Sequence, residues 1–381
     1  MNITLTVPDG STTHGSPELL CKPPEWYEFI IFFFANYVAH VATLVSVPGQ
    51  GTRETINVAI NALLIPSSGI GRAVDIFFRH PIFRRGDQLK KAAAAGALCM
   101  VVRVRPESGD TERFPIILEK NYPWMTSVDP IRSNVKVHGH SCLPAGYAFA
   151  YVPTDAPLSF RKPQRTRLQE QHEIASAYNF PKAIISLVQA VWAIVTLYQS
   201  RGDQIERYGY AAFGLTVAPY AWMSMINLIA TCLAPEYPTL YMVRTAIMNE
   251  AEEAGGIFQG EIGDLDLEEI TTTKDNQGQR QKRIAWLTFL IAIVPLIVVG
   301  SLTHFKAGGS SSLQRGFMMA WLIVGIAGSM LGYTLARTAR DNLYVMLVYM
   351  LVFLPIAVPA IGGFVLVGKM IEEYGTCIYL R

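Results

Sequence analysis

Long stretches without a charged residue constrain this chain more than any other feature of its sequence. Residues 208–235, 284–303, 316–336 and 342–368 contain no Asp, Glu, Lys or Arg. Each is long enough to provide the roughly 20 residues with which an α-helix crosses a bilayer. Charged residues make up 16% of the chain, against about 25% in ordinary soluble proteins. The sequence therefore predicts an all-α polytopic membrane protein.

We predict about seven transmembrane helices by adding three further apolar segments to these runs. The predicted spans are 26–47, 55–78, 174–200, 208–234, 284–303, 316–337 and 342–368. The second is the weakest, because its strictly uncharged part is short. These spans divide the chain into an N-terminal tail (1–25), helices one and two (26–78), an insertion (79–173), helices three and four (174–234), a polar loop (235–283), helices five to seven (284–368) and a C-terminal tail (369–381).

The distribution of Lys and Arg predicts how the chain is oriented in the membrane. Residues 79–173 hold 15 of them, whereas 48–54, 201–207 and 304–315 together hold five. Because cytosolic loops carry the excess of basic residues, we expect a cytosolic N-terminus, a cytosolic insertion and a lumenal or external C-terminus. The first residues are polar and contain prolines, unlike a signal peptide, and the endoplasmic reticulum is the expected membrane.

The insertion contains patterns typical of strands. Residues 88–104 predict a short helix that runs into a strand, and 100–118 predict a hairpin around the "ESGD" turn. Residues 135–153 predict two more short strands, so the insertion is expected to form a small β-rich cap. Residues 249–283 are acidic and then basic, which predicts a loop that is mostly solvated.

The sequence gives little indication of a metal, a cofactor or a nucleic-acid partner. The five cysteines are scattered without a CxxC pair, which argues against a disulfide framework and a standard zinc module. His138, His140 and Cys142 alternate as on one face of a strand, but no fourth ligand is evident. The glycines of 61–80 lack the spacing and the lysine of a nucleotide-binding loop. No basic patch is interleaved with aromatic residues, so no nucleic-acid binding is expected.

A polar stripe marks the second predicted span. At about 100° per residue, five polar residues fall within a narrow arc of the helix: Asn57, Asn61, Ser68, Arg72 and Asp75. Lipid does not accept such a stripe, so we expect it to face the interior of the bundle. An alternative remains open, in which Arg72 and Asp75 pair with each other near the cytosolic headgroups.

Polar residues also follow one side of spans one and four. Span one carries Glu28, Asn36 and His40 at helical spacing, and span four carries Tyr220 and Asn227 beside Trp222. These side chains predict a shared internal cavity, in which aromatic rings stabilise a cation by about 0.5–2 kcal/mol. The alternative is that they only form hydrogen bonds between helices, each contributing about 0.6 kcal/mol.

Two stretches carry a family resemblance: "NALLIPSSGIGRAVDIFF" (61–78) and "APYAWMSMINLIATCLAPEYPTLYMVRTAIMNEAEEAGG" (218–256). With the seven-span layout, they resemble the fungal membrane-bound terpene cyclases of ascofuranone- and macrophorin-type meroterpenoid pathways. The resemblance implies protonation of an olefin or epoxide on a farnesyl chain attached to an aromatic or quinone-like head group. No diphosphate leaves in such a reaction, so no magnesium or other cofactor is expected. Consistent with this, the sequence contains neither DDxxD nor DxDD.

This reaction needs a carboxyl that desolvation keeps protonated. Four candidates follow from their positions: Asp75, Glu28, Asp341 and Glu236. Arg72 favours the ionised form of Asp75, whereas no such partner is evident for Glu28. The residues expected to bind the prenylated substrate are Asn36, His40, Asn57, Asn61, Arg72, Tyr220, Trp222 and Asn227. A membrane transporter, receptor or scaffold without catalysis remains the alternative, and the sequence makes no prediction of oligomeric state.

Overall fold

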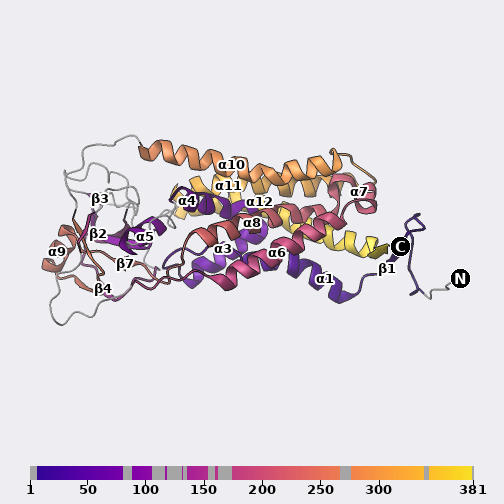
Figure 1. Cartoon of the computed structure of the whole chain (residues 1–381). Coiled ribbons are helices and arrows are strands. Elements are labelled where there is room, and N and C mark those ends of the chain that lie inside the picture. The colour runs from indigo at the N-terminus through magenta and orange to yellow at the C-terminus, as the bar shows by residue number, and fades with distance from the viewer. Residues whose placement is uncertain are drawn as a thin grey trace.

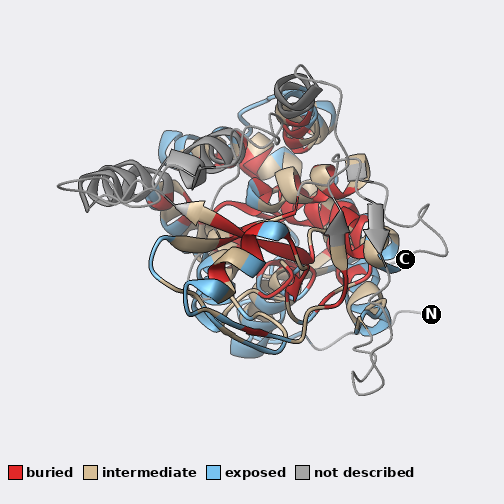
Figure 2. Ribbon diagram, turned by 90° about the vertical axis from the view of Figure 1, so that its left-hand side faces the viewer, coloured by how far each residue is buried: buried red, intermediate tan, exposed pale blue. Residues whose placement is uncertain are grey.

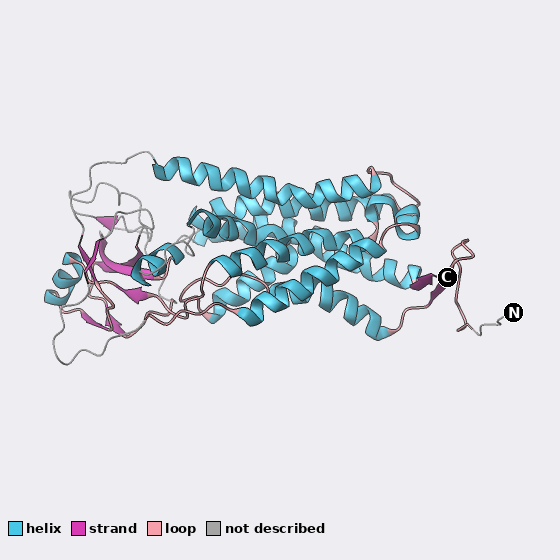
Figure 3. Cartoon of the chain, in the orientation of Figure 1, coloured by secondary structure: helices cyan, strands magenta, loops and turns pink. Residues whose placement is uncertain are grey.

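The computed structural model describes residues 7–79, 88–104, 116–117, 131, 135–152, 159–161, 174–266, 276–338 and 343–379. Long helices run side by side through the middle of the molecule (Figure 1). A β-rich module lies at one end of this bundle, and both chain termini lie at the other end (Figure 3). The prediction of a mostly helical chain with a small β-rich insertion is confirmed.

Among the described residues, three helices are long and apolar enough to cross a membrane. They are α6 (Phe180–Gln199), the 3-10 turn η6 (Phe213–Val217) continued by α8 (Ala218–Leu233), and Arg283–Thr303 within α10 (Asn276–Thr303). Helices α11 (Ser312–Thr338) and α12 (Leu343–Tyr374) complete the bundle. The chain is thus a helical protein with candidate membrane-spanning helices, and the described residues do not show seven.

Helix α6 has its apolar side on the outside. Phe180, Val188 and Tyr198 are 72%, 61% and 70% exposed, whereas the buried side carries the small or polar residues Ser186, Gln189, Ala190 and Ala193. A soluble protein rarely exposes so large an apolar surface. Small residues at the inner face let helices approach closely, as they do in lipid. The outer side of α6 therefore has the character of a lipid-facing surface.

The second predicted span is not a single helix. Helix α3 (Thr52–Leu64) ends at Ile65, a 3-10 turn η2 follows (Pro66–Gly69), and α4 (Ile70–Arg79) leads away again. The Gly49 carbonyl before α3 accepts a hydrogen bond from the Lys136 backbone in the β-rich module. After α4, α5 (Gln88–Ala95) packs into the core of the same module. The chain thus enters the bundle from the module, reverses at Ile65–Gly69, which we call the helix break, and returns.

The β-rich module is built around one strand that is buried on both faces. Strand β2 (Leu98–Val104) pairs antiparallel with β3 (Ile116–Ile117) and β5 (Tyr147–Tyr151), and parallel with β7 (Tyr241–Met242). Leu98 and Met100 point into one core cluster, and Cys99 and Val101 into another. The predicted helix and strands are therefore found, and β2 and β3 pair antiparallel as in the predicted hairpin, whose ESGD turn lies outside the described residues.

The polar loop is more ordered than its charge pattern predicted. Residues 246–266 form α9 (Ala246–Glu253), β8 (Ile257–Gln259) and β9 (Asp264–Asp266). Strand β8 pairs with β4 (His140–Cys142), and β9 with β6 (Ser159–Arg161). This part of the loop is therefore folded, and ion pairs hold some of its charged side chains: Arg244 contacts both Glu252 and Glu261.

A two-stranded sheet joins the two ends of the chain. Strand β1 (Leu19–Lys22) pairs antiparallel with β10 (Thr376–Tyr379), and Cys21 lies opposite Cys377. Their sulfur atoms form a disulfide across a sequence separation of 356 residues. We call this sheet the terminal clasp. The argument against a disulfide framework did not anticipate this single bond, because a pairing between distant strands leaves no local spacing in the sequence.

The terminal clasp also changes the predicted sidedness. The sequence analysis placed the N-terminus and the insertion on one side, and the C-terminus on the other. In the structure the termini lie together, at the opposite end of the bundle from the β-rich module (Figure 1). The two termini therefore do not lie at opposite ends of the bundle, and the segment 55–78 reverses at the helix break instead of running through it. Viewed from the module end, the buried residues gather toward the middle of the molecule (Figure 2).

Candidate functional site

The helix break is held inside the bundle by two buried side chains. The Tyr220 hydroxyl donates to the Leu63 carbonyl, and the Trp321 indole Nε1–H donates to the Leu64 carbonyl at 3.2 Å. These are among the last carbonyls of α3, which lose their helical partners where the helix ends. Backbone groups within a membrane bundle need protein partners. Tyr220 and Trp321 therefore allow helix α3 to end inside the bundle.

A pocket lies beside the helix break. Its walls come from five segments and are mostly apolar: Pro66, Ser67, Tyr210, Leu215, Thr216, Pro219, Val299, Met318, Met319, Trp321, Leu322 and Gly325. The pocket contains ≈ 470 Å³ of empty space when the open solvent at its mouth is counted, and ≈ 30 Å³ of it admits the centre of a water-sized sphere. Its lining is of the kind found in pockets for small molecules, which consist of apolar and aromatic side chains with a few polar groups.

Three hydroxyl groups supply the polarity of the pocket. The Thr216 hydroxyl is used internally, because it donates to the Phe213 carbonyl and accepts from Tyr37. The hydroxyls of Ser67 and Tyr210 make no hydrogen bond within the part of the chain that the structure describes. Ser67 is only 4% exposed. A buried hydroxyl is usually hydrogen-bonded, so Ser67 is available to a bound molecule.

Tyr210 reaches the pocket through a close backbone contact. Helix α7 (Asp203–Tyr208) leads into the 3-10 turn η5 (Gly209–Ala211), and Gly209 adopts φ +58°. A Cβ atom at Gly209 would lie 2.1 Å from the Lys306 carbonyl oxygen. Glycine is therefore needed here both for the left-handed conformation and for the approach of the α10–α11 loop. The Tyr210 backbone N–H then donates to that same carbonyl at 3.0 Å.

Aromatic rings pack behind one wall of the pocket. Trp321 lies 4.6 Å from Phe364 and 5.9 Å from Tyr37, measured between ring centroids, and Tyr37 lies 4.9 Å from Tyr220. The rings meet edge to face or tilted, the arrangements that aromatic pairs prefer. The cluster fixes the orientation of the Trp321 ring, which forms part of the pocket wall.

None of the four predicted acids is among the described residues that line this pocket. Glu28 lies beside the terminal clasp, where it accepts from the Thr376 hydroxyl and the Glu25 backbone and contacts Lys22. The expectation that Glu28 has no charged partner is therefore wrong. Asp75 is half-buried on α4, and Asp341 lies outside the described residues.

Glu236 lies at the module end of the bundle, outside the candidate spans. Its carboxylate accepts from Lys182 Nζ at 2.6 Å and from Asn179 Nδ2 at 2.9 Å. Burial alone raises the pKa of Glu236, but these hydrogen bonds and the Lys182 charge lower it below the ordinary 4.5. Glu236 thus favours its ionised form, which counts against it as a proton donor.

Three predicted substrate residues instead connect helices. The side-chain oxygen of Asn36 accepts from the Thr196 hydroxyl, His40 Nδ1 lies 2.9 Å from the Ser224 hydroxyl, and Asn227 donates to Thr43 at 3.0 Å. All three are buried, as the sequence predicted. Their contacts match the alternative of inter-helical hydrogen bonding, since none lines the pocket.

The polar stripe does not form a continuous inner face. Asn57 and Ser68 are exposed, so the prediction that the stripe faces inward is wrong for them. The helix break changes the direction of the chain between the two halves of the stripe. Asn61 donates to the Asn57 carbonyl, one turn earlier on α3. The Arg72 guanidinium donates to the Ser46 carbonyl at 2.5 Å.

The two aromatic residues predicted to bind substrate also form hydrogen bonds to backbone carbonyls. Tyr220 holds the helix break, and Trp222 donates its indole N–H to the Ile291 carbonyl of α10.

The pocket residues that sequence reasoning missed include Ser67, Met318 and Gly325. A signal for Ser67 was present, because a Pro- and Gly-interrupted apolar segment often marks a binding site in membrane proteins. Met318 and Gly325 lie in an ordinary apolar run and carry no such signal.

Protonation of Glu236 should weaken the anchor between α6 and α8. Because its pKa is lower when folded, Glu236 contributes stability above its unfolded pKa of about 4.3, which is lost as pH falls through the folded value. We expect Glu236→Gln to lose about 1.5–3 kcal/mol at neutral pH, the usual contribution of hydrogen bonds to a charged group, and little further on acidification. Thermal unfolding in detergent at neutral pH and at acidic pH measures these losses of stability. Glu206→Gln on the exposed face of α7 is the control, and equal losses in both variants would contradict the assignment.

Comparison with protein-family models, with curated proteins and with solved structures returns no match to this chain. The class that the fold and the pocket define is therefore stated from the geometry alone. It is a helical protein with candidate membrane-spanning helices, a β-rich module at one end, and an apolar pocket beside an interrupted helix.

Proposed function

We propose that this protein binds a small, mainly apolar molecule with a hydroxyl or carbonyl group in the pocket beside the helix break, and acts as a membrane carrier or receptor. The observation that carries the proposal is the unused Ser67 hydroxyl within an apolar pocket at the point where a helix is interrupted. Interrupted helices form the substrate sites of many membrane transporters. A prenylated phenol or quinone has the required combination of groups.

The cyclase suggested by the family resemblance is the second candidate, favoured by the Trp321 ring in the pocket wall. Its cation cascade would need a proton donor at the ligand. The described residues that line the pocket include no Asp or Glu. Binding without chemistry is therefore the better-supported function, and isomerisation of the bound molecule is a separate outcome of the same experiment.

We further propose six crossings with a re-entrant segment. The crossings are the N-terminal helix, formed by α1 (Trp26–Phe33), η1 (Phe34–Val38) and α2 (Ala39–Val41), and helices α6, α8, α10, α11 and α12. The segment α3–η2–α4 enters and leaves on the module side. An even number of crossings agrees with termini that pair with each other. The second of the seven predicted spans thus becomes a pair of half-helices.

The charges and the disulfide support one orientation of this arrangement. Residues 79–173 at the module end hold 15 Lys and Arg, whereas the loops 201–207 and 304–315 at the clasp end hold four. Basic loops are cytosolic, and disulfides persist in oxidising compartments. We therefore propose a cytosolic β-rich module and a terminal clasp on the lumenal or external side, with the endoplasmic reticulum as the expected membrane.

Filling the pocket should abolish ligand binding without unfolding the protein. A Cβ at Gly325 would lie 3.7 Å from the Ser67 hydroxyl, an ordinary contact, and the rest of a Leu side chain would occupy the pocket. Gly316→Leu on the same helix is the matched control, because nothing lies within 4 Å of its Cβ position. Both changes remove a helical glycine, so they affect helix propensity alike.

The probes are farnesylated phenols and their terminal epoxides, added to the purified protein in detergent. We expect a probe at 100 times its Kd to stabilise the wild type and Gly316→Leu by about 2.7 kcal/mol, and Gly325→Leu to lose at least tenfold in affinity. Mass spectrometry of the recovered probe separates the two functions, because a new isomer of unchanged mass indicates the cyclase. Failure of every probe to bind to folded protein would refute the proposed ligand class.

A further inference from the structure

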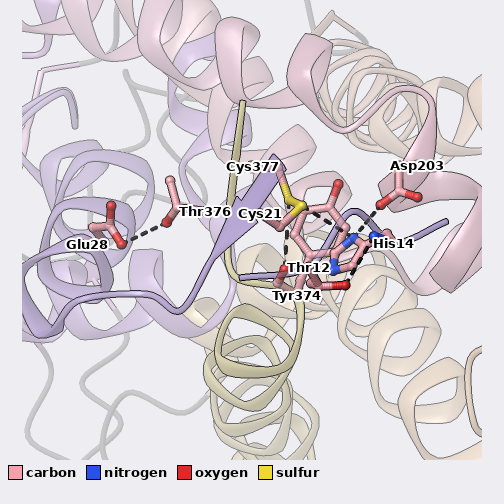
Figure 4. The surroundings of a disulfide bond; sticks show 8 residues. All are labelled: Thr12, His14, Cys21, Glu28, Asp203, Tyr374, Thr376 and Cys377. Atoms are coloured by element: carbon pink, nitrogen blue, oxygen red, sulfur yellow. Dashed lines mark hydrogen bonds and ion pairs between the residues drawn. A yellow bond between two sulfur atoms is a disulfide. The ribbon is translucent and has the colours of Figure 1, made fainter. Parts of the chain in front are cut away.

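The terminal clasp holds a cluster of metal-ligand side chains far from the pocket. Cys21 and Cys377 face each other across β1 and β10, His14 comes from the segment before β1, and Asp203 begins α7. The four side chains converge at this end of the bundle (Figure 4). Among the described residues, His14, Cys21 and Cys377 form the one group of three ligand atoms that lie within 4.8 Å of one another.

One nitrogen lies at the centre of this cluster. Nδ1 of His14 is 2.9 Å from Asp203 Oδ2 and 3.5 Å from Cys21 Sγ. The His14 side chain is only 4% exposed, and its ring lies 5.0 Å from that of Tyr374. Its backbone has φ +49°, a left-handed conformation that is unfavourable for a non-glycine residue. The surrounding contacts thus hold His14 toward the sulfur atoms.

The distance between Cys21 Sγ and His14 Nδ1 suits a tetrahedral metal ion. In zinc sites the metal lies about 2.3 Å from sulfur and about 2.0–2.1 Å from nitrogen. At a tetrahedral angle those two ligands are about 3.5–3.6 Å apart, which matches the separation between Cys21 and His14. Two thiolates, one imidazole and one carboxylate are ligands that zinc accepts, and thiolates select it over magnesium or calcium.

We propose that the terminal clasp, when its disulfide is reduced, binds one Zn²⁺ through Cys21, Cys377, His14 and Asp203. A dithiol supplies two electrons and two protons to the disulfide and itself becomes a disulfide, which leaves two thiols on the protein. Zn²⁺ then binds as the two thiol protons are released to solvent. Reoxidation by a small-molecule disulfide re-forms the S–S bond, reduces that oxidant to two thiols and releases the ion.

The other cysteines and histidines of the described chain are not placed for this. Cys142 and Cys232 are exposed, and Cys99 is buried inside the β-rich module. His138 lies against the ring of Tyr241 at 5.1 Å. The alternating trio of the sequence analysis therefore forms no cluster. The zinc site depends on the pairing of chain ends 356 residues apart, and it is independent of the ligand pocket.

Cobalt provides a direct test, because Co²⁺ bound to thiolates absorbs by charge transfer and occupies zinc sites. The full-length protein in detergent is reduced with a dithiol, freed of it by anaerobic desalting, and titrated with Co²⁺. We expect one equivalent of Co²⁺ to bind to the reduced protein with thiolate absorption, and Zn²⁺ to displace it. The oxidised protein should show neither Co²⁺ binding nor thiolate absorption. The oxidised and reduced samples are the same chain, and circular dichroism of both shows whether reduction leaves the protein folded.

Single substitutions identify the side chains that bind the metal ion. Cys377→Ser should lose the thiolate absorption, Asp203→Asn should weaken Co²⁺ binding at least tenfold, and Cys232→Ser should leave both unchanged. Circular dichroism shows whether each variant is folded. The proposal is overturned if the reduced wild type binds no Co²⁺, or if thiolate absorption persists in the folded double variant Cys21→Ser/Cys377→Ser.

Discussion

In sealed vesicles that expose their cytosolic side, we expect a membrane-impermeant maleimide to label Cys142 completely and a cysteine introduced at Ala307 not at all. Cys142 is exposed on β4 of the module, and Ala307 is exposed in the α10–α11 loop at the opposite end of the bundle. Helices with apolar outer faces separate the two ends. The reagent cannot cross the bilayer, so the difference should be all or none.

The experiment uses Cys232→Ser as the background, which removes the other exposed free thiol. Permeabilisation should make the Ala307→Cys thiol reactive, which shows that this position is accessible once the barrier is removed. Labelling of both positions from one side would mean that the bundle does not cross a membrane. Labelling of Ala307→Cys alone would reverse the proposed orientation and place the disulfide in the cytosol, where thiols are normally kept reduced.

The helices of the bundle were predictable because the bilayer imposes a strong local rule. A crossing helix needs about 20 apolar residues in sequence, and the uncharged runs 284–303 and 316–336 lie within α10 and α11. The strands β2 and β5 were equally predictable from the local sequence, because alternating and β-branched residues identify them. Such features are present in any short window of the chain.

The features that failed depend on residues far apart in sequence. In 55–78 the sequence predicted a single span, whereas Tyr220 and Trp321 supply the hydrogen bonds that let the chain reverse. The disulfide between Cys21 and Cys377 depends on two strands at opposite chain ends. For the same reason burial of Asn36 and His40 was predictable, but their partners on other helices were not.

The candidate site was predictable only in part. The sequence drew attention to 61–80, and the helix break and Ser67 lie there. The remaining walls come from segments between Tyr210 and Gly325, which no periodicity connects. The choice of acids failed to reach the pocket because charged residues in this chain lie near helix ends, where ion pairs such as Lys182–Glu236 satisfy them.

The largest effect on stability should come from Trp321→Ala. Trp321 is 4% exposed, contacts the rings of Tyr37, Tyr220 and Phe364, and donates to the Leu64 carbonyl. A cavity of that size costs about 3 kcal/mol at the rate measured for buried truncations. The unpaired carbonyl adds about 1–3 kcal/mol. Unfolding in mixed detergent micelles measures the total.

Trp286→Ala is the matched control, because Trp286 is 66% exposed on the outer face of α10. The same truncation there leaves no cavity, and we expect a loss within about 0.5 kcal/mol. Trp321→Phe separates the two contributions at the buried site, since it keeps an aromatic ring but removes the N–H donor to Leu64. A loss in Trp321→Phe close to that of the control would mean that the indole hydrogen bond does not hold the helix break. A loss of about 1–3 kcal/mol would mean that the re-entrant segment, and with it the Ser67 side of the pocket, depends on this one bond.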